Sequence, residues 1–228
     1  MRDLADTIEE RGFAILPEVL SADLLDMTIA EILRLAPHRS RAGVRHALAL
    51  QPVAKIANCS QLTELTREVL GPQAFPFRAT LFEKTAVTNW LVVWHQDTSL
   101  PLSERRELQG WGPWSVKEDI TYARGPASAL EQVLALRIHF DDSTEENGPL
   151  RVLPGTHRCG VLSDDEIHEL SNTSSPVDCL VPKRGVVAMR PLAVHSSSKS
   201  RNEKSRRVLH FEYAASELIA DPLRLAIA

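Results

Sequence analysis

Residues 90–97 read Trp-Leu-Val-Val-Trp-His-Gln-Asp, an apolar run that ends in a histidine and an aspartate two positions apart. The run predicts a β-strand, because it is short, contains β-branched and aromatic residues, and is followed by a long polar segment. Side chains at positions i and i+2 of a strand point to the same face. His95 and Asp97 can therefore meet one metal ion at the end of this strand.

The His-x-Asp/Glu triplet is weak evidence when it is taken alone. Eight histidines and 30 acidic residues among 228 positions predict about one such triplet by chance, and the chain contains three. The sequence His139-Phe-Asp141 runs into an acidic turn, so we interpret Asp141 as a turn residue. His210-Phe-Glu212 lies on the last predicted strand, and no histidine follows it to complete a metal site. The triplet at 95–97 is the one that opens into a long irregular segment, as a metal site at a barrel mouth requires.

A third metal ligand is predicted at His195, which follows the apolar run 186–194. Two histidines and one carboxylate are the usual set that holds non-heme Fe(II) with open coordination positions. Arg206 and Arg207 open the final predicted strand, and an arginine beside a metal site can pair with a carboxylate of a co-substrate. Alternation along the strand lets only one of the two point inward. From spacing alone, it is equally open that the basic residues between 199 and 207 form one solvated turn.

Helical patterns occupy the first seventy residues, and strand patterns with turn signals follow. Helices are predicted at 2–11 (ended by Gly12), from Ser21 to Pro37, at 61–70 with Ser60 as its cap, and after Ser163 with a capping box to Glu166. Strands are predicted at 13–16, 75–84, 90–96, 133–140, 150–153, 177–181, 186–189 and 206–213. The segment 98–128 reads as a long irregular connection. The pattern indicates a mainly β protein with N-terminal helices, built as an antiparallel sandwich backed by helices.

Composition excludes several functional classes. The net charge of −4 and the isoelectric point near 6.1 argue against a general nucleic-acid binder. No apolar run approaches the roughly 18 residues of a membrane span, and the acidic N-terminus has no signal-peptide pattern. Three cysteines without a Cys-x-x-Cys spacing favour a reducing compartment. We therefore expect a cytoplasmic protein with no nucleic-acid or membrane partner; the sequence contains no signal for its oligomeric state.

Several stretches together resemble the phytanoyl-CoA dioxygenase family, in the order in which that family has them. The motif Trp94-His-Gln-Asp97 resembles its iron-binding motif. The other similar stretches are 12–17 (GFAILP), 81–84 (LFEK), 141–157 (DDSTEENGPLRVLPGTH), 190–195 (RPLAVH) and 206–213 (RRVLHFEY). The resemblance covers nearly the whole chain. It implies a double-stranded β-helix, also called a jelly-roll or cupin-like fold, in a single oxygenase domain over 1–228. Within that domain we expect helical support at 1–72, a jelly-roll core at 73–215 and a tail at 216–228.

The resemblance also implies a cofactor, a co-substrate and their ligands. His95, Asp97 and His195 would hold Fe(II), and Arg206, eleven positions after His195, would bind the distal carboxylate of 2-oxoglutarate. Lys84 would also approach the co-substrate, with a surface lysine as the alternative. The reaction implied is a dioxygenase reaction that consumes O2, releases succinate and CO2, and hydroxylates a small-molecule substrate. A carboxylate at position 97 favours hydroxylation, because a glycine or alanine there would open a halide position, as in some halogenases.

Substrate contacts are the least determined part of this prediction. Gln96 is a candidate substrate-binding residue because strand ends twist, and Trp111 is a candidate at the substrate mouth. Trp111 and Trp114 are equally explained by ordinary loop packing. The basic stretch from Arg34 to His46 could hold an anionic substrate or form a solvated connection.

Three other functions remain open at this stage. The first is a non-catalytic jelly-roll binding module, and the second is a cupin-like enzyme that uses the same triad with Zn or Mn for non-oxidative chemistry. The third is a nucleic-acid demethylase of the same superfamily, against which the negative net charge counts. Dependence on 2-oxoglutarate and oxygen separates the first two functions from a hydroxylase.

Overall fold

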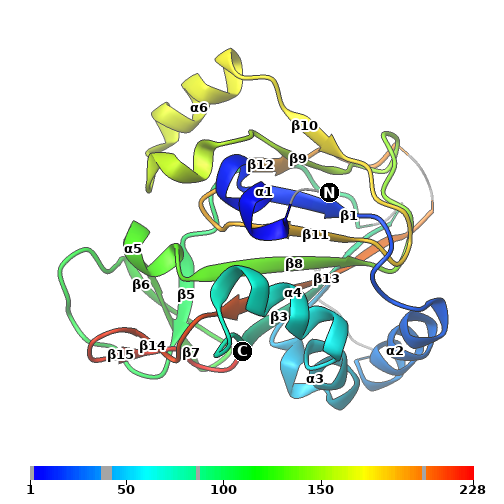
Figure 1. Ribbon diagram of the computed structural model, residues 1–228, viewed down its shortest axis with the longest axis horizontal. Helices are drawn as coiled ribbons and strands as arrows, with labels where there is room; N and C mark the ends of the chain where they lie inside the picture. Colours follow the sequence, from blue (N-terminus) through cyan, green and yellow to red (C-terminus); the bar gives the residue numbers. More distant parts are fainter. Residues whose placement is uncertain (1–2, 37–42, 86–87, 202–203) are drawn as a thin grey trace.

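The computed structural model describes residues 3–36, 43–85, 88–201 and 204–228. Its two central layers are antiparallel sheets: a six-stranded main sheet in the order β1-β11-β8-β13-β3-β2, and a four-stranded sheet in the order β10-β9-β12-β4 (Figure 1). The main-sheet strands are β1 (Phe13–Leu16), β2 (Gly43–Val44), β3 (Phe75–Lys84), β8 (Val133–His139), β11 (Val186–Met189) and β13 (Arg206–Ala214). The second sheet contains β4 (Val92–His95), β9 (Leu150–Val152), β10 (Val177–Cys179) and β12 (His195–Ser197). This strand-rich architecture with N-terminal helices agrees with the sequence prediction.

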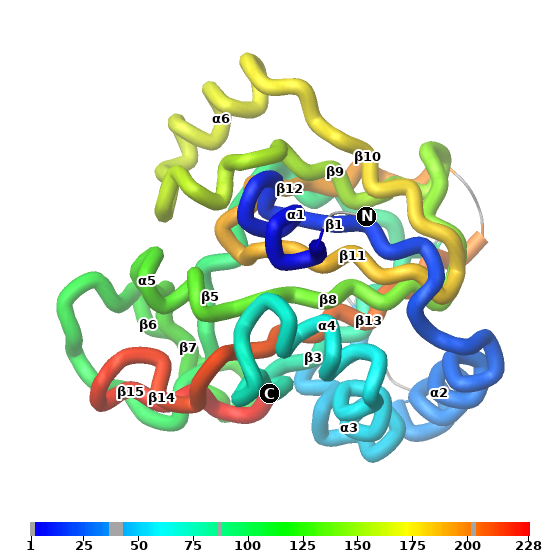
Figure 2. The backbone as a smooth tube through the Cα atoms, in the orientation of Figure 1, coloured from blue at the N-terminus to red at the C-terminus, as the bar shows by residue number. Residues whose placement is uncertain are grey.

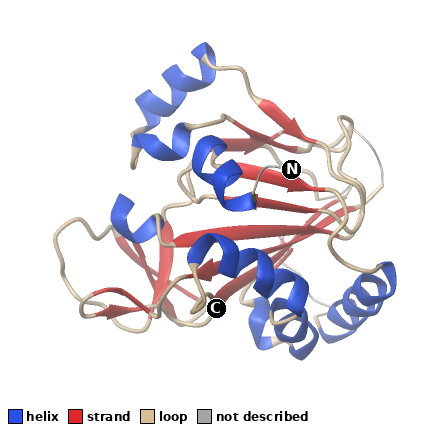
Figure 3. Cartoon of the chain, in the orientation of Figure 1, coloured by secondary structure: helices blue, strands red, loops and turns tan. Residues whose placement is uncertain are grey.

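Helices cover the outer face of the main sheet (Figure 3). They are α1 (Leu4–Arg11), α2 (Ala22–Leu35), the short 3-10 helix η1 (Ala47–Ala49), α3 (Gln51–Ala57) and α4 (Ser60–Leu70). Their apolar residues, such as Ile8 and Ile32, pack in one buried cluster with Leu81 and Leu209 of the sheet. Burial of this apolar surface is the main stabilising contribution to the outer half of the molecule.

Local signals explain where three of these helices begin or end. Gly12 follows α1 with φ 80°, a left-handed conformation that glycine adopts without steric cost. Ser21 caps α2 by accepting a hydrogen bond from the amide of Leu24. Ser163 and Glu166 form the predicted capping box of α6 (Asp164–Thr173). The predicted stop of the second helix at Pro37 lies outside the described residues.

Several predicted elements need correction. The segment 98–128 contains a three-stranded sheet in the order β5-β7-β6 and one short helix, and is not irregular. These elements are β5 (Ser99–Leu102), β6 (Trp114–Lys117), β7 (Ile120–Arg124) and α5 (Ala127–Leu130). Each strand has only four or five residues, and Pro101 and Pro113 lie within or beside them, so the sequence carries a turn signal where the chain forms a sheet. The helices α3 and η1 and the strand β12 were not predicted, and α4 starts after Cys59, which makes no side-chain cap.

The segment 216–228 is part of the packed structure and not a loose tail. It forms β14 (Leu218–Ala220) and β15 (Leu223–Arg224), which pair with each other. The last residue, Ala228, exchanges backbone hydrogen bonds with β3, donating to Phe77 at 2.7 Å and accepting from Ala79 at 2.9 Å. Figure 2 shows the chain end beside β3. That residues 1–228 form a single domain stays a prediction.

No helix within the described ranges is both long and apolar enough to span a membrane. The cytoplasmic location stays a prediction.

Packing of the C-terminal segment gives a testable difference in stability. Leu223 is fully buried, whereas Ile227 is 61% exposed. We expect Leu223→Ala to lower the free energy of unfolding by about 2–4 kcal/mol, because it removes buried methyl groups and leaves a cavity. The control Ile227→Ala should change it by less than about 0.5 kcal/mol. Urea denaturation of both variants measures the difference, and equal stability of the two would contradict the packing described here.

Candidate active site

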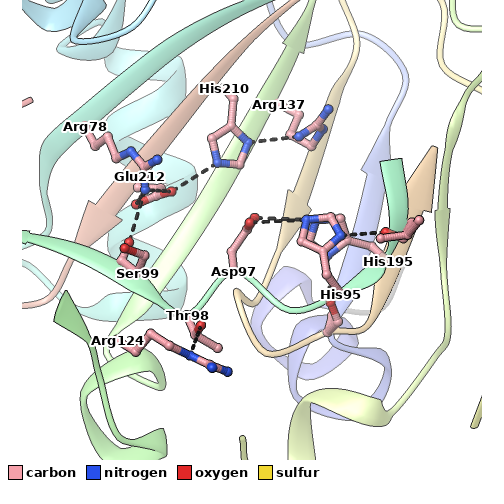
Figure 4. A network of polar contacts seen from close by, with 12 residues as sticks. Arg78, His95, Asp97, Thr98, Ser99, Arg124, Arg137, His195, His210 and Glu212 are labelled. Carbon is pink, nitrogen blue, oxygen red and sulfur yellow. Dashed lines mark hydrogen bonds and ion pairs between the residues drawn. The ribbon is translucent and has the colours of Figure 1, made fainter. Parts of the chain in front are cut away.

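Antiparallel pairing of β4 with β12 brings together the three residues predicted as metal ligands. His95 and His195 are register partners across these two strands. Asp97 follows the end of β4, where its backbone amide donates to the carbonyl of Pro191 at 2.9 Å. One donor atom from each of the three side chains lies within 4.8 Å of the others (Figure 4). The structure thus brings together the three residues named from the sequence, and their role as metal ligands stays a prediction.

Backbone carbonyls orient both imidazole rings. Nδ1 of His95 lies 2.8 Å from the carbonyl oxygen of Val93, and Nδ1 of His195 lies 2.9 Å from that of Ala193. A carbonyl only accepts, so each Nδ1 carries the proton and each Nε2 keeps its lone pair. The two Nε2 atoms face the Asp97 carboxylate at 3.6 Å and 3.5 Å. Such backbone bonds are the usual way in which a protein fixes the tautomer of a metal-binding histidine.

Electrostatics of the triad favour an ionised Asp97 and a neutral His195, whereas for His95 burial is outweighed by the hydrogen bond and charge of Asp97, which raise its pKa. Burial raises the pKa of the Asp97 carboxyl, but the neighbouring His195 and His95 outweigh this and hold it well below its usual value. Burial lowers the pKa of His195 to about 4, despite the opposing charge of Asp97. An ionised Asp97 and a neutral His195 are therefore present at neutral pH. A two-histidine, one-carboxylate set of this kind fits Fe(II).

The triad opens into a cavity of about 250 Å³ between the two sheets. Alternate residues of β3 line it, because the other residues of that strand face the helices: Arg78, Thr80, Phe82 and Lys84. The facing wall contributes His95, Asp97, Leu150, His195, Ser196 and Ser197. The remaining lining residues are Trp90, Val92, Arg137, Arg206, His210 and Glu212. The inner face of the main sheet is thus polar and charged, whereas its outer face is apolar.

Two buried cationic side chains, Lys84 and Arg206, are register partners at one end of this cavity, and a third, Arg137, also lines it. Burial, together with the charges of Arg206 and Arg137, lowers the pKa of Lys84 to about 7. Burial, together with the charge of Arg137, lowers the pKa of Arg206 to about 9. Nε of Arg206 is buried and has no hydrogen-bond partner within the part of the chain that the structure describes. An unpaired buried cation is costly, so this end of the cavity is suited to an anion.

The structure separates Arg206 from Arg207. Arg206 is 4% exposed and faces the cavity. Arg207 points to the opposite face, where Asp141 accepts hydrogen bonds from its backbone amide, its Nε and its Nη2. Asp141 is therefore the partner of Arg207 and takes no part in the cavity. The triplet His139-Phe-Asp141 is not a metal site, since Asp141 is engaged elsewhere.

Lys84 is buried in the cavity wall and is not a surface lysine. It is 2% exposed, and its Nζ donates to Oγ of Ser197 at 2.8 Å and to the carbonyl of Ser198. It therefore ties the end of β3 to β12, two residues beyond His195. Its ammonium group also lies 5.6 Å from the ring centroid of Trp90.

The two predicted substrate residues do not line the cavity. Gln96 points away from the triad, as ideal alternation requires: its amide nitrogen donates to the carbonyls of Gly160 and Leu192, both at 2.8 Å, and its oxygen accepts from the amide of Leu162. Gln96 thus fastens the segment after η2 (Thr156–Cys159) to the strand that carries His95. The predicted substrate contact of Gln96 is corrected to a supporting role.

Trp111 belongs to a hydrophobic cluster and not to a substrate mouth. It is 9% exposed and packs with Leu100 and Ala129 among others. Trp114 is partly buried against the same cluster. In the basic stretch 34–46, the arginines at 39 and 41 lie outside the described residues, and Arg45 is exposed and does not line the cavity.

A chain of polar contacts on the inner face of the main sheet was missed from sequence. Nη1 of Arg137 lies 3.1 Å from Nδ1 of His210, and Nε2 of His210 lies 3.3 Å from Oε1 of Glu212. Arg78 donates to the same carboxylate at 3.1 Å and to the carbonyl of Ser99 at 3.2 Å. Figure 4 shows this chain across the cavity from the triad. The available signal was strand alternation: Arg78 and Lys84 share one face of β3, and His210, Glu212 and Arg206 share one face of β13.

The chain belongs to the phytanoyl-CoA dioxygenase (PhyH) family, since the model of that family matches residues 8–208. This is a family of non-heme Fe(II)- and 2-oxoglutarate-dependent oxygenases, and iron and 2-oxoglutarate are its cofactor and co-substrate. The resemblance and the cofactor class expected from sequence are thereby confirmed.

Two curated relatives and one solved structure illustrate the similarity. The chain is 24% identical over 186 residues to L-proline trans-4-hydroxylase of Streptomyces griseoviridis, covering 70% of this chain and 62% of that protein. It is 20% identical over 250 aligned positions to ectoine dioxygenase of Stutzerimonas stutzeri (strain A1501), covering 92% of this chain and 76% of that protein. The epimerase SnoN, crystallised with Fe3+, alpha ketoglutarate and nogalamycin RO, superposes with a TM-score of 0.70 at 17% identity, over 92% of this chain and 82% of that one. The structural likeness confirms the predicted double-stranded β-helix fold.

Burial of Lys84 predicts a pH dependence of stability. Its pKa falls from an ordinary 10.5 to about 7 in the folded protein, so between these values the unfolded chain binds the additional proton. The free energy of unfolding should therefore rise with pH across this window. We expect the free energy of unfolding of the metal-free wild type, relative to that of Lys84→Met, to be higher at pH 9.5 than at pH 6.5. Urea denaturation at both pH values measures the difference.

The matched control is Lys55→Met, on the exposed face of α3. Its stability difference from wild type should be the same at both pH values. A pH-independent difference for Lys84→Met as well would contradict the described burial of the ammonium group.

Proposed function

We propose that this protein is an Fe(II)- and 2-oxoglutarate-dependent dioxygenase that hydroxylates a small molecule and releases succinate and CO2. The observation that carries the proposal is that a His-Asp-His triad and a buried cationic end share one cavity. A metal site explains the first feature, and a dicarboxylate co-substrate explains the second. A non-catalytic binding module or a non-oxidative cupin-like enzyme accounts for the triad but gives no reason for the buried cations.

In this proposal His95, Asp97 and His195 hold the iron, and Arg206 binds the distal carboxylate of 2-oxoglutarate. The donor set fits, because both histidines present a free Nε2 toward an ionised carboxylate. Arg206 fits as well, because its buried guanidinium faces the cavity with an unused Nε donor. Iron and 2-oxoglutarate, when bound, supply the activation of O2 by which the substrate is oxidised.

Residues of the chain orient these groups and exclude water. Val93 and Ala193 keep the two histidine rings in place through their carbonyl groups. Lys84 ties Ser197 and Ser198 to β3 and so keeps β12, which carries His195, against the main sheet. Apolar surface from Phe82 lines the wall between the polar groups and limits access of water to the cationic end.

Cavity size supports a small substrate. The cavity of about 250 Å³ must hold the co-substrate as well as the substrate. At the wall opposite the triad, the Arg78–Glu212 ion pair offers both a donor and an acceptor to a polar compound. The carboxylate at Asp97 supports hydroxylation as the reaction type. The named substrates of the two curated relatives, L-proline and ectoine, are small polar compounds as well.

The decisive experiment is an anaerobic titration of the metal-free protein with Fe(II) and then 2-oxoglutarate. We expect a visible charge-transfer band in wild type, because a 2-oxo acid that chelates Fe(II) at such a site absorbs visible light. His195→Ala should abolish the band. Arg206→Met should raise the 2-oxoglutarate concentration needed for half-saturation by about tenfold or more, because it removes a charge-assisted hydrogen bond to a carboxylate.

Arg207→Gln is the control, since Arg207 faces Asp141 outside the cavity. It should titrate as wild type does. A folded, iron-loaded wild type that gives no band would overturn the proposal. It would favour a non-catalytic binding module or a non-oxidative cupin-like enzyme.

A further inference from the structure

Arg137 is a buried cation that has no role in the proposed binding of iron or of the distal carboxylate. It lies on β8, where its neighbours Leu136 and Ile138 face the helices, so its own side chain points into the cavity. The residue is 8% exposed, and its Nε is buried with no hydrogen-bond partner among the described residues. No carboxylate in the described ranges forms an ion pair with it. A guanidinium has five N–H donors, and most of those of Arg137 are unused.

The guanidinium of Arg137 is nevertheless held in one place. Its Nη1 lies 3.1 Å from Nδ1 of His210. Its Cζ lies 5.6 Å from the ring centroid of Phe82. His210 in turn contacts Glu212, so the position of Arg137 is set by two neighbouring strands of the main sheet. An ordered cation with unused donors that lines a cavity is a preformed anion site.

Strand register separates Arg137 from Arg206 along the cavity. Arg206 is the register partner of Lys84, whose ammonium group contacts Ser197 and Ser198, beyond His195 of β12. Arg137 is the register partner of His210, four positions further along β13. Figure 4 shows Arg137 and His210 across the cavity from the triad. Arg137 is therefore the cation that faces the metal-binding end, and Arg206 lies at the Ser197 end.

We propose that Arg137 is a second anion-binding residue that contacts the 2-oxo-acid end of 2-oxoglutarate, while Arg206 contacts the distal carboxylate. This inference rests on the proposed function. The co-substrate has two carboxylates, and the cavity offers two separate guanidinium groups with unused donors. One bound dianion would relieve the repulsion between Arg137 and Arg206 that the protein bears without it. Arg137 then belongs to the co-substrate site and is not available for a substrate carboxylate.

The test compares two ligands that differ only at one end. 2-Oxovalerate has the 2-oxo-acid end of 2-oxoglutarate but a methyl group in place of the distal carboxylate. Dissociation constants for both come from anaerobic titration of the Fe(II) protein, followed by its absorption band and, independently, by calorimetry. Arg137→Met should weaken both ligands by about the same factor, on the order of 10- to 100-fold, because both have the carboxylate that Arg137 contacts.

Arg206→Met should give the opposite pattern. It should weaken 2-oxoglutarate by about tenfold or more and leave 2-oxovalerate within about threefold of wild type. The preference for 2-oxoglutarate over 2-oxovalerate thus survives in Arg137→Met and is lost in Arg206→Met. Arg207→Gln should leave both constants unchanged.

Three results would overturn the inference. Unchanged binding of both ligands in Arg137→Met would mean that Arg137 contacts neither end. Weaker binding of 2-oxoglutarate alone in Arg137→Met would mean that Arg137 contacts the distal carboxylate instead. Wild-type affinity for 2-oxovalerate in Arg137→Lys, which keeps the positive charge but lacks the planar guanidinium, would contradict a specific contact by that group. If the wild type itself binds Fe(II) but neither ligand, the proposed function fails, which is a distinguishable outcome.

A thermal measurement protects the test against misfolding. Because Arg137 lines the same cavity as Lys84 and Arg206, its replacement by methionine removes repulsion among buried cations. Arg137→Met without metal or ligand should therefore melt at or above the wild-type temperature. Its stabilisation by added 2-oxoglutarate and Fe(II) should be smaller than that of wild type. A variant that melts lower and retains the full ligand-induced shift would contradict the inference.

Discussion

Pairing of β4 with β12 is the interaction on which the site depends. Because His95 and His195 are register partners, one correct ladder brings both imidazoles to the same place. A slip of one residue would turn one histidine to the other face of the sheet and dismantle the triad. Three contacts outside this ladder hold the register: the amide of Asp97 on Pro191, the side chain of Gln96 on the segment after η2, and Lys84 on Ser197 and Ser198. The geometry of the triad is thus maintained by backbone and side-chain contacts that do not involve the metal-binding groups themselves.

The main sheet has two faces with opposite chemistry, and this division defines the cavity. On β3 and β13 the residues that face the helices are mostly apolar, and those that face the second sheet include Arg78, Lys84, Arg206, His210 and Glu212. Buried charges destabilise a fold unless they are paired. Here Arg78 and Glu212 pair with each other, whereas the cations at the other end lack an acidic partner within the described ranges. The unpaired end is therefore where a ligand of opposite charge contributes most to stability.

Much of this arrangement could be predicted from the sequence, for identifiable reasons. The strands 75–84 and 186–189 have the predicted bounds, because each is bordered by clear turn residues. The triad was found because His-x-Asp at a strand end is a local pattern and the distal histidine follows an apolar run. Strand β12 was not found, since its three residues, His-Ser-Ser, have little β-propensity and are fixed only by neighbouring strands. For the same reason the sheet at 99–124 was missed.

The errors at Gln96 and Trp111 and the omission of Arg137 have a common cause. Sequence spacing tells which side chains share a face of one strand, but not which faces of different strands enclose a cavity. Gln96 lies next to two predicted ligands, and it nevertheless points to the outer side, where three backbone groups need hydrogen bonds. Arg137 lies in a strand whose other residues, apart from His139, are apolar, so nothing in the spacing linked it to the site. Only the pairing of β8 with β13 brings it beside His210 and into the same cavity as Arg206. A buried charged residue in an otherwise apolar strand is therefore the feature of a sequence that most deserves a search for a ligand.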